Sequence, residues 1–197
     1  MRLGIFGGSF DPPHVGHLLA AGDACEQLAL DRLVLVPAAT QPLKAGRAVA
    51  TAQQRLAMVR LLATDDPRFE VSAFEVEQGG LSFTVDTLAH FARLHPDAER
   101  FLLVGADVVE TFAQWKNPER ILELARPVLL ERQQGGADRS GPEGVPGPGG
   151  LRVMRLPTRR IDVSSTEVRE RVRLGKPIRG FVTDDVAAFI ARDGLYR

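Results

Sequence analysis

The stretch Gly4-Ile5-Phe6-Gly7-Gly8-Ser9-Phe10-Asp11-Pro12-Pro13-His14-Val15-Gly16-His17-Leu18 passes from a short apolar run, through glycines and prolines, into a segment of helical period. This order predicts a buried strand, a tight turn and a helix in succession. A helix N-terminus presents unpaired backbone N–H groups and partial positive charge, so the junction suits a phosphate. Gly7 and Gly8 remove side chains where a phosphate or a base would approach the backbone.

Two histidines stand at the start of the predicted helix. His14 and His17 are three residues apart, so both imidazoles are expected to project to the same side, and Gly16 leaves that side clear. Imidazoles beside a phosphate can donate hydrogen bonds to oxygens that gain charge during phosphoryl transfer. Such a reaction needs no nucleophilic side chain, because a substrate phosphate can attack the α-phosphorus directly.

Three other interpretations of this stretch remain open. The dinucleotide-binding loop of a dehydrogenase has the spacing G-x-G-x-x-G, which the stretch lacks. Zinc ligation by the two histidines needs a third ligand, for which Asp11 or Asp23 is available. The histidines can also simply cap the helix and pack, although packing alone gives little reason for the combination of glycine, proline and histidine.

Apolar runs alternate with segments of helical period along the rest of the chain. This alternation predicts a doubly wound α/β fold of Rossmann type, with a mostly parallel sheet and a small C-terminal helical extension. The expected strands are Leu3–Phe6, Leu33–Pro37, Phe69–Phe74, Phe101–Val104, Pro127–Leu130 and Leu151–Leu156. The expected helices have apolar faces at Leu18/Ala21/Cys25/Leu28, Leu56/Val59/Leu62 and Val85/Leu88/Phe91, and further helices span Pro118–Leu124, about 164–174 and Asp184–Arg192.

The domain organisation is expected to be a single domain over residues 1–197. Ten of the eighteen residues from 133 to 150 are Gly or Pro, so this segment is expected to hold no regular element and to form a flexible surface loop. Residues 164–197 form the C-terminal helical part, which Ser164 and Glu167 open with the spacing of a capping box.

Composition indicates an ordinary globular protein. Lys plus Arg equals Asp plus Glu at 25 each, which gives no reason to expect nucleic-acid or membrane binding. Cys25 is the only cysteine, so an intrachain disulfide is excluded. No apolar run approaches the roughly 18 residues of a membrane span. We therefore expect a cytoplasmic protein, and the sequence leaves its oligomeric state, including a homo-oligomer, open.

The opening stretch resembles the H-x-G-H signature of the nucleotidyltransferase superfamily. Among its members it is most similar to the bacterial nicotinate mononucleotide adenylyltransferases, whose opening commonly reads G-x-F-G-G-[ST]-F-D-P-x-H-x-G-H. The segment Val163-Ser164-Ser165-Thr166-Glu167-Val168-Arg169 is similar to the second family signature, I-S-S-T-x-x-R, and the resemblance extends over nearly the whole chain. It implies that His14, His17 and Arg169 are catalytic. It also implies that ATP is bound by Gly7, Gly8, Ser9, Phe10, His17, Lys44, Asp107, Ser164, Ser165, Thr166 and Arg169.

The same resemblance implies where the acceptor nucleotide binds. Ser82-Phe83-Thr84 and Gly105-Ala106-Asp107…Trp115 are similar to the family segments that surround the nicotinate. By resemblance, Ser9, Thr84 and Trp115 contact the acceptor, with Trp115 stacked on the pyridine ring; ordinary core packing of Trp115 and N-capping by Thr84 are the alternatives. The chain departs from the family pattern at Gln41, where a proline is usual, and at Phe83, where a tyrosine is usual.

The implied reaction joins the AMP part of ATP to nicotinate mononucleotide, giving nicotinate adenine dinucleotide and pyrophosphate for NAD biosynthesis. Mg²⁺ is expected to enter with the ATP phosphates, because it is a hard cation that keeps its waters. Rival functions are an adenylyltransferase for nicotinamide mononucleotide or phosphopantetheine, a cytidylyltransferase, and a non-catalytic nucleotide-sensing module. A phosphopantetheine enzyme usually has Thr-Asn where this chain has Pro13-His14.

Overall fold

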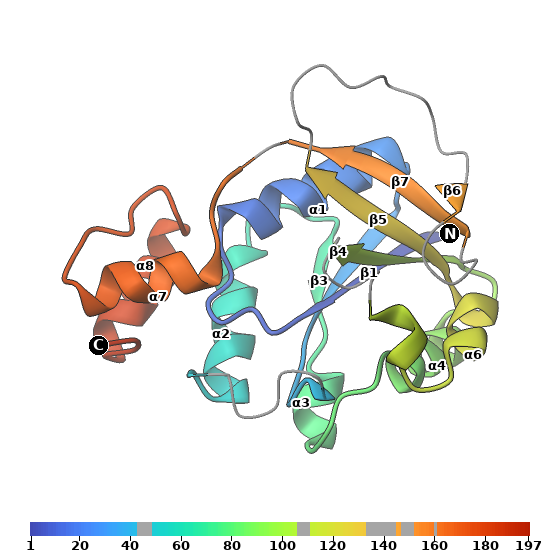
Figure 1. Cartoon of the computed structure of the whole chain (residues 1–197), viewed down its shortest axis with the longest axis horizontal. Helices are drawn as coiled ribbons and strands as arrows, with labels where there is room; N and C mark the ends of the chain where they lie inside the picture. Colours follow the sequence, from blue (N-terminus) through green and yellow to red (C-terminus); the bar gives the residue numbers. More distant parts are fainter. Residues whose placement is uncertain (43–48, 106–110, 133–144, 147–151, 160) are drawn as a thin grey trace.

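The computed structural model describes residues 1–42, 49–105, 111–132, 145–146, 152–159 and 161–197 (Figure 1). Strands alternate with helices along the chain, as the hydrophobic pattern predicts. The strands are β1 (Arg2–Gly8), β2 (Arg32–Pro37), β3 (Phe69–Val71), β4 (Glu99–Gly105), β5 (Arg126–Arg132), β6 (Val145–Pro146) and β7 (Arg152–Thr158). The helices are α1 (Val15–Gln27), α2 (Ala52–Leu62), α3 (Phe74–Gln78), α4 (Thr84–Leu94), η2 (Phe112–Gln114), α6 (Pro118–Leu124), α7 (Ser165–Arg173) and α8 (Asp184–Arg192).

The strands form one sheet in the order β3-β2-β1-β4-β5-β7-β6. All neighbouring strands are parallel except β6, which runs antiparallel to β7. In the register, Ile5 of β1 lies between Val34 of β2 and Leu102 of β4. The chain winds outward from β1 in both directions, which confirms the doubly wound, mostly parallel fold.

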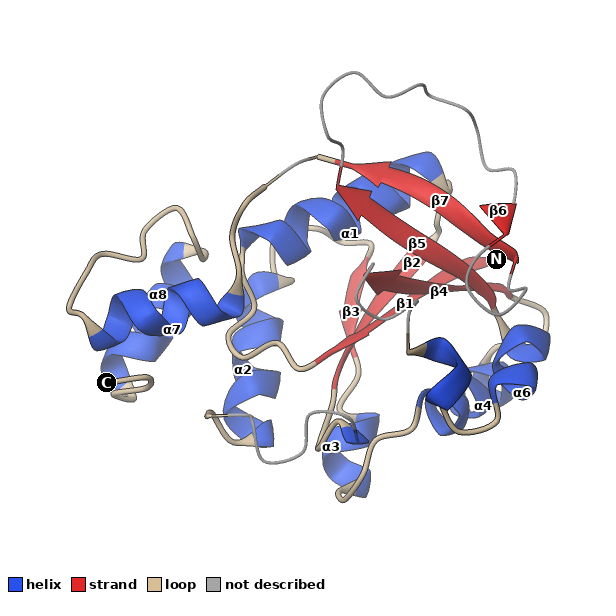
Figure 2. Cartoon of the chain, viewed as in Figure 1, coloured by secondary structure: helices blue, strands red, loops and turns tan. Residues whose placement is uncertain are grey.

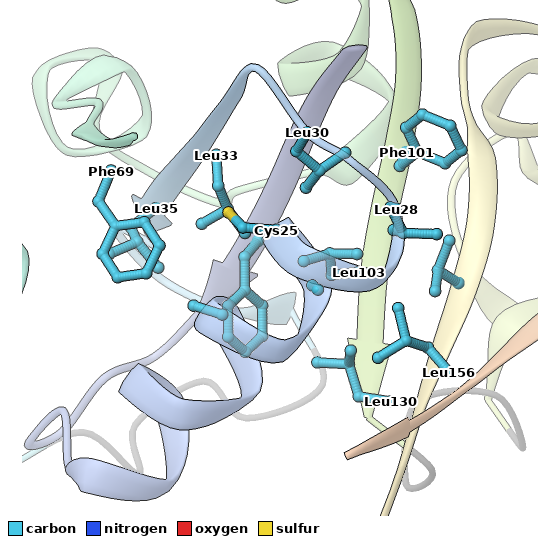
Figure 3. Close-up of a cluster of buried hydrophobic side chains, with 14 of the residues drawn as sticks. Cys25, Leu28, Leu30, Leu33, Leu35, Phe69, Phe101, Leu103, Leu130 and Leu156 are labelled. Carbon is cyan, nitrogen blue, oxygen red and sulfur yellow. The ribbon is translucent and has the colours of Figure 1, made fainter. Parts of the chain in front are cut away.

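Alternate residues of the central strands face opposite sides of the sheet. Leu3 and Ile5 join the core under α4 and α6, whereas Phe6 joins the core under α1 and α2. Figure 3 shows this second core, in which Cys25 of α1 and Leu28, the residue that follows this helix, meet Leu33 and Leu103 of the sheet. Helices therefore cover both faces of the sheet (Figure 2), and this explains why the strands are apolar at consecutive positions.

The C-terminal helices pack on α2 instead of on the sheet. Met58 and Leu62 of α2 meet Val168 of α7 and Ile190 of α8 in a third buried cluster. In Figure 1, α7 and α8 lie beyond α2, at the far side from α4 and α6. The expected C-terminal helical extension is confirmed.

Two local expectations were wrong. The expected strand Phe69–Phe74 ends at Val71, because the Ser72 side chain accepts the Phe74 N–H at 3.2 Å and turns the chain into α3. Within the glycine- and proline-rich segment 133–150, expected to hold no regular element, Val145–Pro146 pairs with β7; the remainder of that segment lies outside the described residues. Of the helices that the structure describes, none has the length and apolar character needed to span a membrane.

Candidate active site

The candidate site lies at the carboxyl ends of β1, β2 and β4. The strand order reverses at β1, because β2 and β3 lie on one side of it and β4 and β5 on the other. Open α/β sheets bind ligands at the carboxyl ends of the strands where the order reverses. The loop that follows β1 carries the H-x-G-H segment into α1. Asp107, expected after β4, and Lys44, expected after β2, lie outside the described residues.

The two histidines lie against each other at the start of α1. His14 is the N-cap, and its backbone N–H donates to Nδ1 of His17 at 3.2 Å. The ring centroids are 3.8 Å apart, which confirms that both imidazoles project to the same side. Because Nδ1 of His17 accepts a hydrogen bond, the neutral ring carries its proton on Nε2, and that N–H is the donor suited to a substrate oxygen.

Gly16 leaves the room that the His14 ring occupies. A Cβ at position 16 would lie 3.0 Å from Nδ1 and 3.1 Å from Cε1 of His14. Such contacts are tighter than nine in ten real Cβ contacts, so the His14 ring would have to shift by a few tenths of an ångström. The glycine of H-x-G-H therefore makes room for the first histidine.

Phe10 supports His17 from inside the protein. Its side chain is 2% exposed, and its ring meets the His17 ring edge-on at 4.9 Å. A Cβ on Gly8 would lie 3.1 Å from the Phe10 ring, whereas a Cβ on Gly7 would meet nothing closer than 4.0 Å. Packing thus explains Gly8, and any contact of Phe10 with ATP must come from its backbone.

The second motif is bound to the first. Ser165 donates its hydroxyl to the Pro12 carbonyl at 2.8 Å, and Arg169 donates to the Asp11 carbonyl at 2.7 Å. Ser164 caps α7 by accepting the Glu167 N–H at 3.1 Å, and Thr166 accepts from Arg169 at 3.2 Å. Two helix N-termini from opposite ends of the chain therefore meet beside the histidines.

Asp11 and Asp23, the alternative metal ligands, are both engaged elsewhere. The Asp11 carboxylate accepts the backbone N–H groups of Val49 at 2.8 Å and Ala50 at 3.1 Å and the Tyr196 hydroxyl at 2.7 Å. The Asp23 carboxylate accepts the Arg159 N–H at 2.8 Å and pairs with its guanidinium at 3.1 Å. Both carboxylates hold loops in place, which argues against the zinc interpretation.

Arg55 of α2 is a buried charge, with only 2% of its surface exposed. Burial lowers the pKa of its guanidinium, although the nearby Asp11 and Glu75 oppose this shift. The burial of Arg55 could have been predicted from the sequence. Arg55 stands four residues before Val59, so both residues lie on the apolar face of the helix. Arg55 donates to the carbonyls of Ser9 (2.8 Å), Ala38 (2.6 Å), Ala39 (2.8 Å) and Ala50 (3.3 Å).

Two of the expected acceptor residues, Thr84 and Trp115, lie near the start of α4. Thr84 is the first residue of this helix, as expected, and Phe83 is the N-cap, so the alternative in which Thr84 serves as the N-cap does not hold. Trp115 is half-buried, 5.5 Å from the Phe112 ring. The next residue, Lys116, lies 4.5 Å from the centroid of the Phe83 ring, which brings Trp115 and Thr84 into one neighbourhood.

Ser9 and Gln41 join the loops that follow β1 and β2. The Ser9 hydroxyl donates to Oε1 of Gln41 at 2.7 Å. Gln41 stands where the family pattern has a proline, so this contact is made by a side chain that the pattern lacks. No signal in the sequence pointed to it, nor to the buried roles of Glu75 and Tyr196.

Comparison with known proteins gives one consistent result. The model of the cytidylyltransferase-like family matches residues 5–171. A probable nicotinate-nucleotide adenylyltransferase of Gemmatimonas aurantiaca is 52% identical over 199 residues, covering 100% of this chain and 93% of the relative. One from Thermus thermophilus is 43% identical, with 100% of both chains covered. The fold is similar to that of Plasmodium falciparum nicotinic acid mononucleotide adenylyltransferase complexed with NaAD, with a TM-score of 0.76, 17% identity and coverage of 99% and 97%.

Proposed function

The chain belongs to the cytidylyltransferase-like family and, within it, to the nicotinate-nucleotide adenylyltransferases, and on that premise we propose how it transfers AMP from ATP to nicotinate mononucleotide. An oxygen of the acceptor phosphate attacks the α-phosphorus of ATP in line with the leaving group. The new P–O bond forms as the bond to the β-phosphate oxygen breaks, and pyrophosphate leaves with the electron pair. The products are nicotinate adenine dinucleotide and pyrophosphate.

The observation that carries this proposal is the meeting of two helix N-termini at the histidine pair. Ser165 and Arg169 bind the carbonyls of Pro12 and Asp11, so the α7 terminus is held against the H-x-G-H loop. Backbone N–H groups at both termini suit a polyphosphate. His17 donates through Nε2 to the α-phosphate as charge develops, and His14 assists.

The ATP contacts follow from the same arrangement. We assign the β- and γ-phosphates to Ser165, Arg169 and Lys44, together with the hydroxyl and N–H groups of Ser164 and Thr166. Gly7, Gly8 and the backbone of Phe10 lie along the nucleotide, and Asp107 contacts the adenosine. Ser9, which the Arg55 guanidinium holds by its carbonyl, faces both substrates.

The acceptor is placed by Thr84 and Trp115. The Thr84 N–H opens α4 and suits the nicotinate carboxylate, because helix N-termini attract anions. Trp115 offers a flat π surface for the pyridine ring. This assignment favours the acid form of the acceptor over the amide form.

A divalent cation accompanies nucleotidyl transfer in this family, and we propose that it is Mg²⁺ bound to the ATP phosphates. The donors of the described site are histidine, arginine, hydroxyl and N–H groups, which suit a metal that the nucleotide carries. The metal neutralises phosphate charge, and the protein groups orient the two substrates.

We also propose that residues 1–197 act as one nucleotidyltransferase domain, with 164–197 as its C-terminal helical part. In support, α7 and α8 share a buried cluster with α2, and Arg169 of α7 contacts the H-x-G-H loop.

The test is pyrophosphate release by the purified protein with Mg-ATP. Nicotinate mononucleotide, nicotinamide mononucleotide and phosphopantetheine are offered in separate reactions. Release with the nicotinate form, at a kcat/KM well above that of the other two, supports the proposal. Preference for another acceptor keeps the H-x-G-H chemistry but overturns the assigned acceptor. ATP binding without release from any acceptor favours a nucleotide-sensing module.

A further inference from the structure

Glu75 is a buried acid that the reaction does not use. It lies in α3 and is only 7% exposed, whereas Glu77 on the same short helix is exposed. The Glu75 carboxylate accepts the hydroxyl of Thr87, which is 3% exposed, and the Ser82 side chain lies near enough to lower the pKa of this carboxyl group. Burying a carboxylate is costly unless its hydrogen bonds are satisfied, so its position calls for an explanation.

Ser82 and Thr87 lie on either side of Thr84. Ser82 stands two residues before Thr84, and Thr87 stands three residues after it, one turn into α4. The hydrogen bond from Thr87 ties Glu75 to the first turn of α4, and the nearby Ser82 side chain lies on the approach to this helix. The backbone N–H of Thr84 lies between these two residues.

Ser82 extends the same network to the end of β2. Its hydroxyl oxygen accepts the Ala39 N–H at 2.9 Å, and its own N–H donates to the Thr40 carbonyl at 2.9 Å. The Ser82 side chain therefore links the end of β2 to the neighbourhood of Glu75, whose carboxyl pKa it lowers.

Arg55 holds this segment from the other side. It donates to the carbonyls of Ala38 and Ala39, and its charge acts on Glu75 through space. Burial raises the pKa of Glu75, while the two hydroxyls and Arg55 oppose that rise. The end of β2 and the start of α4 are thus joined by a network that contains one buried acid and one buried base.

We propose that Glu75 is a positioning residue for the acceptor, which orients the first turn of α4 so that the Thr84 N–H meets the carboxylate of nicotinate mononucleotide. The inference rests on the proposed function, since it concerns how the same acceptor is recognised. Glu75 acts through Ser82 and Thr87 and does not touch the substrate.

The test compares Glu75→Gln with Glu77→Gln, an identical change on the same helix at an exposed position. In Glu75→Gln, an amide N–H₂ can replace an acceptor oxygen, so at least one hydroxyl must turn. The KM for nicotinate mononucleotide is expected to rise roughly five- to thirtyfold, the size of the loss of one or two hydrogen bonds. The KM for ATP is expected to stay within about twofold of wild type, and Glu77→Gln to match wild type in both.

A second readout separates positioning from a merely structural role. The ratio of kcat/KM for the nicotinate form to that for the nicotinamide form is expected to fall in Glu75→Gln, because only the acid form depends on the oriented N–H. The proposal is overturned if this ratio is unchanged. It is also overturned if the KM for ATP rises as much as the KM for nicotinate mononucleotide. If Glu75→Gln does not fold, Thr87→Val removes the hydroxyl that donates to Glu75, and the same expectations and the same contrary results apply to it.

Failure of this inference differs from failure of the proposed function. Wild-type protein that turns over nicotinate mononucleotide, together with unaltered acceptor kinetics in Glu75→Gln, counts against the role of Glu75 alone. Wild-type protein that is inactive with nicotinate mononucleotide counts against the function and, with it, against this inference.

Discussion

His17 is oriented by neighbours on two sides. Its Nδ1 accepts the His14 N–H at 3.2 Å, and the Phe10 ring meets its ring edge-on at 4.9 Å. These contacts fix the tautomer and the direction of Nε2 before any substrate arrives. Orientation of this kind lowers the reorganisation needed in the transition state.

His17→Ala is expected to reduce kcat by at least about a hundredfold, because it removes a donor to the charge that develops on the α-phosphate. The fold is expected to remain, since the ring is not part of the deep core. Pyrophosphate release measures kcat, and circular dichroism measures whether the fold is retained. His95→Ala, at the far end of α4, is the control. Near-normal turnover by His17→Ala would contradict the mechanism.

Gly16→Ala is expected to lower activity without lowering stability. Alanine is favoured over glycine inside a helix by about 1 kcal/mol, so α1 gains stability. The new Cβ lies 3.0 Å from Nδ1 of His14 and displaces that ring. The melting temperature and kcat are to be measured together. Gly22→Ala on the same helix is the control, because a Cβ there meets nothing within 4 Å. Wild-type activity in Gly16→Ala would show that the position of the His14 ring does not affect the reaction.

At the scale of elements, α1 joins the site to the core. Its N-terminus carries the histidines, and two turns later Cys25 packs among leucines of the sheet (Figure 3). Burial raises the pKa of the Cys25 thiol to about 11. The reactive thiolate is therefore absent over the neutral range and forms only as the pH approaches that value.

Cys25 is expected to resist thiol–disulfide exchange at pH 8 in the native protein and to react fully once the protein is unfolded in guanidinium. Titration with a chromogenic disulfide reagent measures both states, and the unfolded sample serves as the control because the chain has one cysteine. Rapid native reaction would mean that α1 opens from the sheet more readily than its packing indicates.

Local signals predicted the helices better than the shorter elements. Pro118 begins α6 and Gly194 follows α8 within two residues of its end, so both helices match their expected bounds. β3 ended early because one serine side chain turns the chain after three strand residues. A run of apolar residues does not reveal such a turn, since Ser72 is equally acceptable within a strand.

At the scale of the whole molecule, a residue near the C-terminus is hydrogen-bonded to the loop that carries the first motif. The Tyr196 hydroxyl donates to Asp11 at 2.7 Å across 185 residues, and both side chains are buried. Burial and Asp11 raise the pKa of the Tyr196 phenol, so the hydroxyl stays protonated and remains a donor. The C-terminal helical part therefore contacts the H-x-G-H loop through Tyr196.

Tyr196→Phe is expected to destabilise the protein by about 1–2 kcal/mol, because the buried Asp11 carboxylate loses a donor. Since Arg169 binds the carbonyl of the same residue, kcat is expected to fall several-fold as well. Thr183→Ala is the matched control. It removes the N-cap of α8, at a cost of about 1 kcal/mol, without touching Asp11. If Tyr196→Phe and Thr183→Ala lose the same amount of activity, the Tyr196 contact only stabilises the fold and does not position the site.

The sequence by itself determined the alternation of strands and helices, the helix starts and the two family signature motifs. These depend on hydrophobic period, caps and glycines, which act over a few residues. Only the tertiary structure decided that Asp11 is a structural acceptor, that Arg55 and Glu75 are buried, and that Tyr196 reaches the first motif. These roles come from contacts between segments far apart in the chain, where burial and hydrogen-bond partners depend on packing and not on neighbouring residues.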